Sequence, residues 1–346
     1  MLTALAIIFT FGIVVFFHEF GHFLAAKRSG VKVEKFSLGF GPEIIGFTKG
    51  GTRYLLSAVP LGGYLKMAGE NPEEAREGKP DEFLSQPWYK KIFIVLAGPV
   101  MNFVLAILLF SLVVFVWGQP VVKMDEARIG EVTIDSPADK AGLKSGDKII
   151  AVDGTAVTTW EDMSRVIHNK ASQPVELKIS RQERELKIKV VPKYDKERKV
   201  GLIGIVAPFE MKRMNLLNSL QKGVEQTYDW SVLTLKFLGL MIVGKVKADV
   251  SGPVGIGQLI SQVASTGLSN LFYLIAIISV NLGLFNLFPI PILDGGHIMF
   301  FTYEGISGKP LDVKKVNIAQ VIGMSILIAI MIFATYKDFL RIFGNG

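Results

Sequence analysis

Residues 92–117 form one continuous apolar run, IFIVLAGPVMNFVLAILLFSLVVFVW, which contains no charged side chain. A helix of about 20 such residues is long enough to cross the hydrocarbon core of a bilayer. Because no water is present there to satisfy the backbone, a single apolar segment can span only as a helix. Similar runs occupy residues 1–24, 270–288 and 317–336. The pattern predicts a polytopic α-helical membrane protein with four transmembrane helices.

The composition agrees with this class of protein. The 346-residue chain is 50% hydrophobic, and its mean hydropathy is +0.40. Its net charge of +7 comes from basic residues beside apolar segments, which favours membrane flanks over a nucleic-acid partner. The absence of cysteine excludes disulfides and cysteine-ligated metal. Because the first basic residue is Lys27, the N-terminal run lacks the basic start of a signal peptide and is interpreted as a mature helix.

Two halves of a membrane core enclose a different kind of segment. The first half, residues 1–117, joins its two spans through a mixed loop at 25–90, and the second half, residues 270–346, joins its spans through a loop with the sequence LDGG. Between them, residues 120–207 show period-two alternation on both sides of the stretch SRQERE, which predicts a β-hairpin in a soluble domain. Residues 136–154 of this domain predict a short helix, a glycine-marked turn and a strand.

Residues 213–244 leave two alternatives open. Leu217, Leu220 and Val224 recur at helical spacing, but charged side chains interrupt the apolar run. The segment is either a further span or an amphipathic helix at the membrane interface, and we favour the second. Lysine and arginine are frequent in loop 25–90, so this loop is expected on the cytoplasmic side. The N-terminus and domain 120–207 are then extracytoplasmic.

The first span contains the sequence HEFGH, which is unusual for a segment in lipid because buried ionisable groups are costly there. His18 and His22 are four residues apart and share one helix face, where they can bind one metal ion. Glu19 is placed to act as a general base on a water at that ion, as in the HExxH pattern of zinc hydrolases. The alternative is a pair of neutral histidines packed in a helix bundle.

Catalytic zinc usually takes three protein ligands and keeps a fourth position open. Asp294, in NLFPIPILDGGH, is the best candidate for the third, because the prolines end the preceding helix and Gly295 and Gly296 permit a tight turn that aims Asp294 inward. His297 is then interpreted as structural or supporting. The histidines and Asp294 reach the same leaflet only if 213–244 does not cross, so a zinc site requires four spans.

Three motifs together carry a resemblance. HEFGH in the first span, GPVMN in the second and NLFPIPILDGG at the third resemble the site-2 protease family (M50) of intramembrane zinc metalloproteases, and in particular its bacterial RseP-type branch. The resemblance implies Zn²⁺ held by His18, His22 and Asp294, with Glu19 as the catalytic base. It implies cleavage of a transmembrane helix in pre-trimmed membrane proteins of the anti-sigma-factor type, and of remnant signal peptides, in the bacterial inner membrane. The active site would lie near the cytoplasmic side.

The resemblance also implies a substrate-binding set. Its members come from the third span, the second span and a membrane-embedded β-hairpin region; they are Asn286, Asn102, Gly62, Gly63, Tyr64 and Leu65. An edge strand in this region could hold an unwound substrate by β-augmentation. Alternatively, the asparagines serve helix packing and the glycines form an ordinary cytoplasmic hairpin.

Residues 120–207 resemble a single extracytoplasmic PDZ domain, through DSPADKAGLKSGDKIIAVDG and VGLIGI. Such a domain could contact the substrate ectodomain or its newly exposed C-terminus, or exclude bulky ectodomains by size. Two other classes of function remain alternatives: a catalytically silent membrane-tethered PDZ scaffold and a metal transporter. The intact Glu19 speaks against both.

Overall fold

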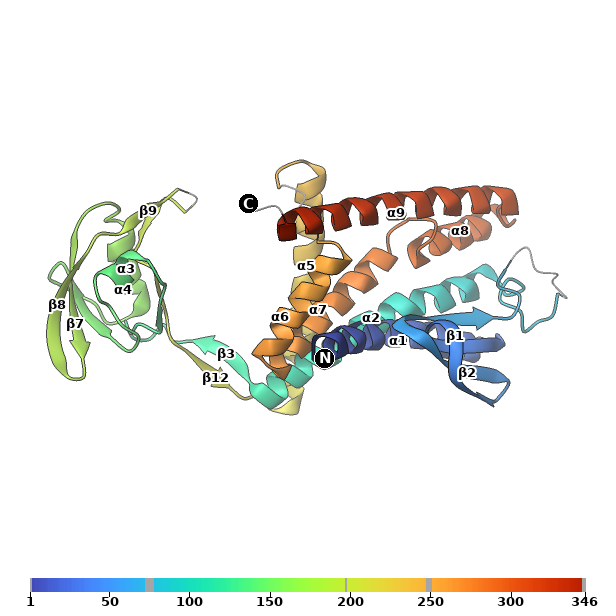
Figure 1. The fold of residues 1–346 in the computed structure, drawn as a ribbon, viewed down its shortest axis with the longest axis horizontal. Helices are drawn as coiled ribbons and strands as arrows, with labels where there is room; N and C mark the ends of the chain where they lie inside the picture. Colours follow the sequence, from blue (N-terminus) through green and yellow to red (C-terminus); the bar gives the residue numbers. More distant parts are fainter. Residues whose placement is uncertain (1, 72–77, 197, 247–250, 344–346) are drawn as a thin grey trace. The chain divides into compact units, whose positions relative to one another are not determined.

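The computed structural model describes residues 2–71, 78–196, 198–246 and 251–343. The chain divides into two compact units (Figure 1). The first, here called the helical unit, comprises Met1–Val116 and Asn215–Gly346. The second, the middle unit, is Trp117–Met214 and contains the whole of the predicted soluble domain.

Long helices dominate the helical unit. Its helices are α1 (Leu2–Arg28), α2 (Trp88–Trp117), α5 (Leu216–Ile242), α6 (Pro253–Thr266), α7 (Leu268–Asn286), α8 (Asp294–Ser307) and α9 (Val313–Phe343). Among the described residues, four helices are long and apolar enough to cross a membrane, namely α1, α2, α7 and α9. They coincide with the four predicted spans, but α9 extends the last one by several residues at each end.

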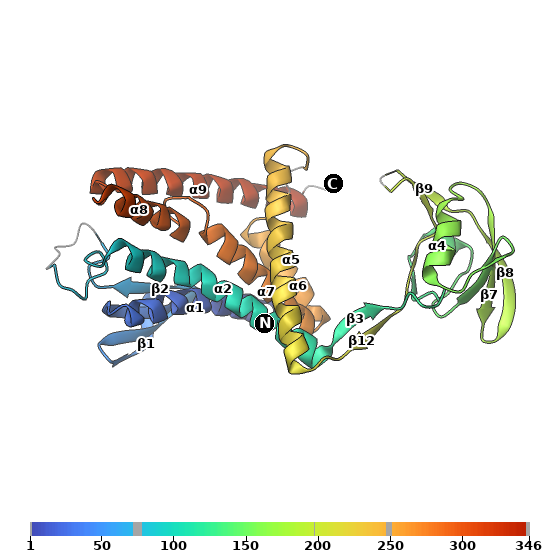
Figure 2. The same ribbon diagram turned by 180° about the vertical axis from the view of Figure 1, so that it is seen from behind.

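Helix α5 corresponds to the ambiguous segment, and it is not among the four. Both views show it running at a steep angle to α1, α2 and α9 (Figures 1 and 2). Polar contacts attach it to α7: Trp230 Nε1 donates to the Tyr273 hydroxyl at 3.1 Å, and Thr234 Oγ1 donates to Asn281 Oδ1 at 2.9 Å. This arrangement agrees with an amphipathic helix that lies across the spans, and placement at the interface stays a prediction.

Helix α6 is held by a carboxylate from a different helix. Its N-cap, Gly252, has no side chain to bind the free N–H groups of the first turn. Asp338 of α9, which is 1% exposed, supplies the acceptors instead. The N–H of Gly252 donates to one carboxylate oxygen at 3.0 Å, and the N–H of Gly255 donates to the other at 2.8 Å. Sequence patterns predicted neither α6 nor this contact.

A long antiparallel hairpin follows α1. Its strands are β1 (Val33–Lys49) and β2 (Thr52–Met67). The strands fold back on each other, because residues 35–38 of β1 pair with residues 63–66 of β2 on one side and with residues 53–56 on the other. The C-terminal part of β1, next to the turn between the strands, exposes apolar side chains, among them Ile44, Ile45 and Phe47. Strand β2 packs along α1, as both views show (Figures 1 and 2). This is the predicted β-region, and its insertion into the membrane stays a prediction.

The middle unit combines short strands with two short helices. Its elements are β3 (Gln119–Val122), β4 (Glu131–Val132), α3 (Pro137–Lys140), β5 (Lys148–Val152), β6 (Thr155–Ala156), α4 (Trp160–His168), β7 (Val175–Arg181), β8 (Arg184–Val190), β9 (Lys193–Asp195), β10 (Val200–Leu202), β11 (Ile205–Val206) and β12 (Phe209–Lys212). The predicted hairpin is present as β7 paired with β8, and α3 with β5 matches the predicted helix, turn and strand. Strands β3 and β12 pair with each other, so the two ends of the unit lie side by side.

The middle unit has a hydrophobic core of its own. Ile149, Leu177 and Ile179 from the central sheet are fully buried, and Met163 of α4 packs in the same cluster. Thr159 and Asp162 form a capping box that begins α4 at its observed position. A domain with a complete core can fold without its neighbours.

Candidate metal centre

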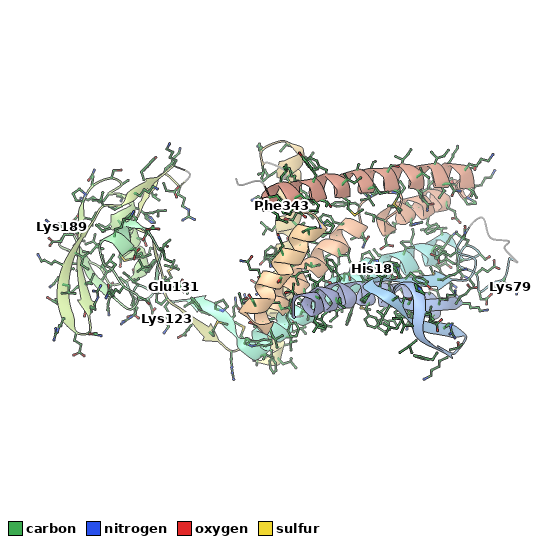
Figure 3. All side chains as sticks on the ribbon, in the orientation of Figure 1. His18, Lys79, Lys123, Glu131, Lys189 and Phe343 are labelled. Atoms are coloured by element: carbon green, nitrogen blue, oxygen red, sulfur yellow. The ribbon has the colours of Figure 1, made fainter. Side chains whose placement is uncertain are left out.

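His18 and His22 lie one turn apart on α1, and Asp294 faces them from the first residue of α8. The two Nε2 atoms are 3.3 Å apart. His18 Nε2 lies 3.1 Å from Asp294 Oδ2, and His22 Nε2 lies 3.6 Å from Asp294 Oδ1. Figure 3 labels His18 among the helices of the helical unit. The structure therefore brings together the three residues expected to bind zinc.

These atoms are spaced as zinc ligands should be. Nitrogen and oxygen ligands about 2.0–2.2 Å from a tetrahedral zinc ion are roughly 3.3–3.5 Å from one another. The side chains of the three residues are only 10, 12 and 17% exposed. Moreover, Asp294 Oδ2 is buried and has no hydrogen-bond partner in the part of the chain that the structure describes. Converging lone pairs with an orphaned carboxylate oxygen fit a divalent cation at their centre.

Asp294 reaches the site because the chain folds back after α7. Gly295 and Gly296 were expected to form a turn after Asp294, and this is wrong: both lie in the first turn of α8. A side chain at Gly295 would come within 2.2 Å of the Phe288 carbonyl oxygen, and one at Gly296 within 2.3 Å of the Ile290 carbonyl oxygen. The glycines are thus needed because the returning proline-containing loop packs directly on the helix start.

Close packing of α1 on α2 completes the site. A side chain at Gly21 would meet the Ala97 carbonyl oxygen at 2.2 Å, and one at Gly98 would meet His22 Nε2 at 2.3 Å. From α2, the backbone carbonyl of Ile94 lies 2.9 Å from His22 Nδ1, and the Asn102 side-chain amide lies 3.1 Å from His18 Nδ1. Helix α2 therefore contacts the outer nitrogen of each histidine.

A cavity of about 500 Å³ opens beside the three ligands. Among the residues that line it are Glu19, Tyr64, Leu65, Asn286 and His297. The backbone N–H of Leu65 lies beside the Glu19 carboxylate. His297 faces the cavity but is not one of the three grouped ligands, and burial lowers the pKa of its imidazole.

The predicted substrate residues do not all face this cavity. Tyr64, Leu65 and Asn286 line it. A Cβ at Gly63 would lie 3.6 Å from Glu19, while Gly62 packs against the ring of Phe40. Asn102 is fully buried against His18, so its contacts are with the metal centre.

One part of the site had no counterpart in the sequence-based expectations. Lys91 of α2 is 3% exposed, and its Nζ lies 2.7 Å from both carboxylate oxygens of Glu304 on α8. Lys91 also lies over the ring of Phe301, 5.1 Å from its centroid. In the sequence Lys91 is simply a basic residue that precedes the second apolar run, and only the presence of α8 shows that it has a buried partner.

Comparisons with known proteins agree with this geometry. The sequence model of Peptidase family M50 matches residues 6–330. The chain is 32% identical to Zinc metalloprotease RasP of Geobacillus kaustophilus, over 98% of each chain. It is 31% identical to Regulator of sigma-W protease RasP of Bacillus subtilis, over 99% of each chain.

Among solved structures, the PDZ domain of the SdrC-like protein from Listeria monocytogenes is similar to part of the chain. It is 26% identical, covers 25% of this chain and 92% of its own, and has a TM-score of 0.22. The family match and the relatives extend over nearly the whole sequence, including both histidines, Glu19 and Asp294. The chain therefore belongs to peptidase family M50, and it is a zinc metalloprotease.

Proposed function

We propose that this metalloprotease hydrolyses a peptide bond within a transmembrane helix of another membrane protein. The observation that carries the proposal is the position of the metal centre: its histidines lie in an apolar helix that is long enough to span a bilayer. The name of the Bacillus subtilis relative, a regulator of sigma-W, supports membrane-bound anti-sigma factors as one class of substrate. The proposed substrates also include other pre-trimmed single-span proteins and remnant signal peptides.

The residues around the cavity have distinct roles in this reaction. Zinc bound here would lower the pKa of a water molecule and polarise the carbonyl under attack. The Glu19 carboxylate takes a proton from the attacking water and returns it to the leaving amide nitrogen, so the products are a carboxylate and an amine. The N–H of Leu65 beside Glu19 orients that carboxylate. Asn286, which also lines the cavity, would donate from its side-chain amide to the developing oxyanion.

The substrate must unwind before its backbone can be attacked. Residues 63–67 in the C-terminal part of β2 pair with residues 33–38 of β1 on one edge, and their other edge has no strand partner among the described residues. The segment Gly62–Leu65 lies toward the C-terminal end of β2, where Tyr64 and Leu65 line the cavity. We infer that an extended substrate segment adds to this edge by main-chain hydrogen bonds, which would hold it next to Glu19.

Purified wild type and Glu19→Gln provide the test of function. Both should bind zinc, since glutamine keeps the size of the side chain and leaves the three ligands in place. Wild type should cleave a synthetic transmembrane peptide, and Glu19→Gln should be slower by about 10²–10⁴-fold, the usual contribution of a general base. Removal of zinc with a chelator should abolish cleavage, and added zinc should restore it.

Equal cleavage by the two proteins would contradict the assignment. Zinc binding by wild type without cleavage of any membrane peptide would instead favour the silent scaffold or the metal transporter.

The proposed topology places the N-terminus and the middle unit outside the bacterial inner membrane and loop 25–90 inside. The absence of cysteine makes this easy to test, because an introduced cysteine is the sole thiol. Both Lys79 and Lys189 are exposed (Figure 3). In intact cells, a membrane-impermeant maleimide should label Lys189→Cys but not Lys79→Cys. The reverse pattern would invert the topology.

A further inference from the structure

Asn102 occupies an unusual position for a polar side chain. It lies in the apolar helix α2, is 0% exposed, and does not line the cavity. Its side-chain nitrogen Nδ2 lies 3.1 Å from His18 Nδ1, while its oxygen Oδ1 is buried without a hydrogen-bond partner among the described residues. The Ser279 hydroxyl of α7 donates to the Asn102 backbone carbonyl at 2.8 Å, which fixes the backbone but leaves the amide oxygen unused.

The chemistry of His18 determines which end of the amide it needs. His18 faces Asp294 and His22 through Nε2, so Nε2 is the atom available to a metal. A neutral imidazole that offers a lone pair at Nε2 carries its proton on Nδ1. Nδ1 is therefore a donor and requires an acceptor, which Nδ2 of an amide is not. A half-turn of the amide exchanges its two ends, which have the same shape.

That half-turn gives the Nδ1–H of His18 an acceptor and gives the amide oxygen of Asn102 a donor. It places Oδ1 of Asn102 where it accepts the Nδ1–H of His18, and it removes the orphaned oxygen. The second histidine supports this arrangement: His22 Nδ1 lies 2.9 Å from the backbone oxygen of Ile94, which can only accept. Helix α2 would then supply one acceptor for each ligand histidine, two turns apart on the same face.

We propose that Asn102 is a positioning residue for the metal centre: its side-chain oxygen accepts the Nδ1–H of His18 and holds the ring with Nε2 directed at the zinc ion. This role replaces the expectation that Asn102 contacts substrate, because Asn102 is buried away from the cavity. It rests on zinc binding by His18, His22 and Asp294, which the proposed function shares. Its test is zinc affinity rather than cleavage, so the two can fail separately.

The experiment compares zinc affinity in Asn102→Leu and Asn102→Asp. The full-length chain in detergent is freed of metal, and zinc is titrated in competition with a chromophoric chelator. Asn102→Leu keeps the volume but removes the acceptor, and it should weaken zinc binding about 10–100-fold, as loss of such outer partners does elsewhere. Asn102→Asp keeps an acceptor oxygen and should bind within about threefold of wild type or more tightly, as carboxylate–histidine–zinc arrangements do.

Ser279→Ala is the matched control. It removes the contact to the Asn102 backbone without touching the amide, so zinc affinity should stay at the wild-type value. Zinc affinity of Asn102→Leu equal to wild type would overturn the proposal, and a raised KM with that result would return Asn102 to substrate binding. Asn102→Asp as weak as Asn102→Leu would overturn it too, because shape rather than the acceptor would then matter.

A second measurement covers the case in which Asn102→Leu does not fold. The chain has only four histidines, so ¹⁵N-histidine labelling gives few NMR signals. In the zinc-loaded wild type, the His18 Nδ1–H should appear as a slowly exchanging proton, because it is buried and hydrogen-bonded. A His18 Nδ1 without a proton, or with one that exchanges rapidly with water, would overturn the proposal.

Discussion

At the scale of single residues, the metal centre depends on a position that has no side chain as well as on the ligands. Gly98 lies where the two histidine rings pass α2, and any side chain there would occupy the same space as His22 Nε2. The ligands themselves could be found from sequence, because HExxH has a fixed spacing and a carboxylate after an apolar helix is costly. The requirement for glycine could not, since it arises only when α1 and α2 are packed together.

Gly98→Ala should therefore damage the site without altering a ligand. Its Cβ would lie 2.3 Å from His22 Nε2 and 2.9 Å from His18 Cε1, so both rings would have to move. We expect zinc affinity to fall on the order of tenfold or more, the lower range for disturbed ligand geometry. Chelator competition measures this directly. Gly12→Ala is the control, because nothing lies within 4 Å of its added Cβ, and it should bind zinc as wild type does.

At the scale of elements, the sequence predicted the four spans and missed two helices of the helical unit, α6 and α8. The spans are long apolar runs, and their high mean hydropathy is recognisable from the sequence alone. Helix α8 was overlooked because it begins with Asp294, Gly295 and Gly296, which favour turns when considered locally. The reason that it is a helix is tertiary: the folded-back loop packs on its first turn, and Lys91 pairs with Glu304 in its last turns.

The pair between Lys91 and Glu304 should be important for the placement of α8. Lys91→Met leaves Glu304 without its partner in a largely buried place, and removal of one member of such a pair costs about 3–5 kcal/mol. We expect a lower thermal unfolding temperature and weaker zinc binding, because Asp294 lies at the other end of α8. The double variant Lys91→Met/Glu304→Leu should recover most of the stability, since replacing both charges with apolar groups is often neutral. A double variant no more stable than Lys91→Met would contradict this account.

At the scale of the whole molecule, the two units have separate cores, and the metal centre lies entirely within the helical one. The sequence indicated this division because residues 120–207 show period-two alternation, whereas the segments before and after them contain continuous apolar runs. We propose that the middle unit, with its PDZ-like pattern, limits which substrates reach the active site, either by excluding large ectodomains or by contacting a newly exposed C-terminus.

Replacement of residues 120–207 by a short flexible linker tests this proposal. The helical unit should still fold and bind zinc, because the core around its ligands contains no residue of the middle unit. Cleavage of a short transmembrane peptide should remain within a few-fold of wild type, and cleavage of the same helix carrying a folded ectodomain should appear. If the substrate with the folded ectodomain still resists cleavage, the selection by size lies in the helical unit.

The contact between Asp338 and α6 couples two segments that are far apart in sequence. A tilt of α6 would either move the C-terminal end of α9 as well or break the two hydrogen bonds from α6 to the Asp338 carboxylate. The other end of α9 contributes Val313, Val316 and Gln320 to the wall of the cavity. We infer that a displacement of α6 would move α9 and, with it, this part of the cavity wall, without any change at the zinc ligands.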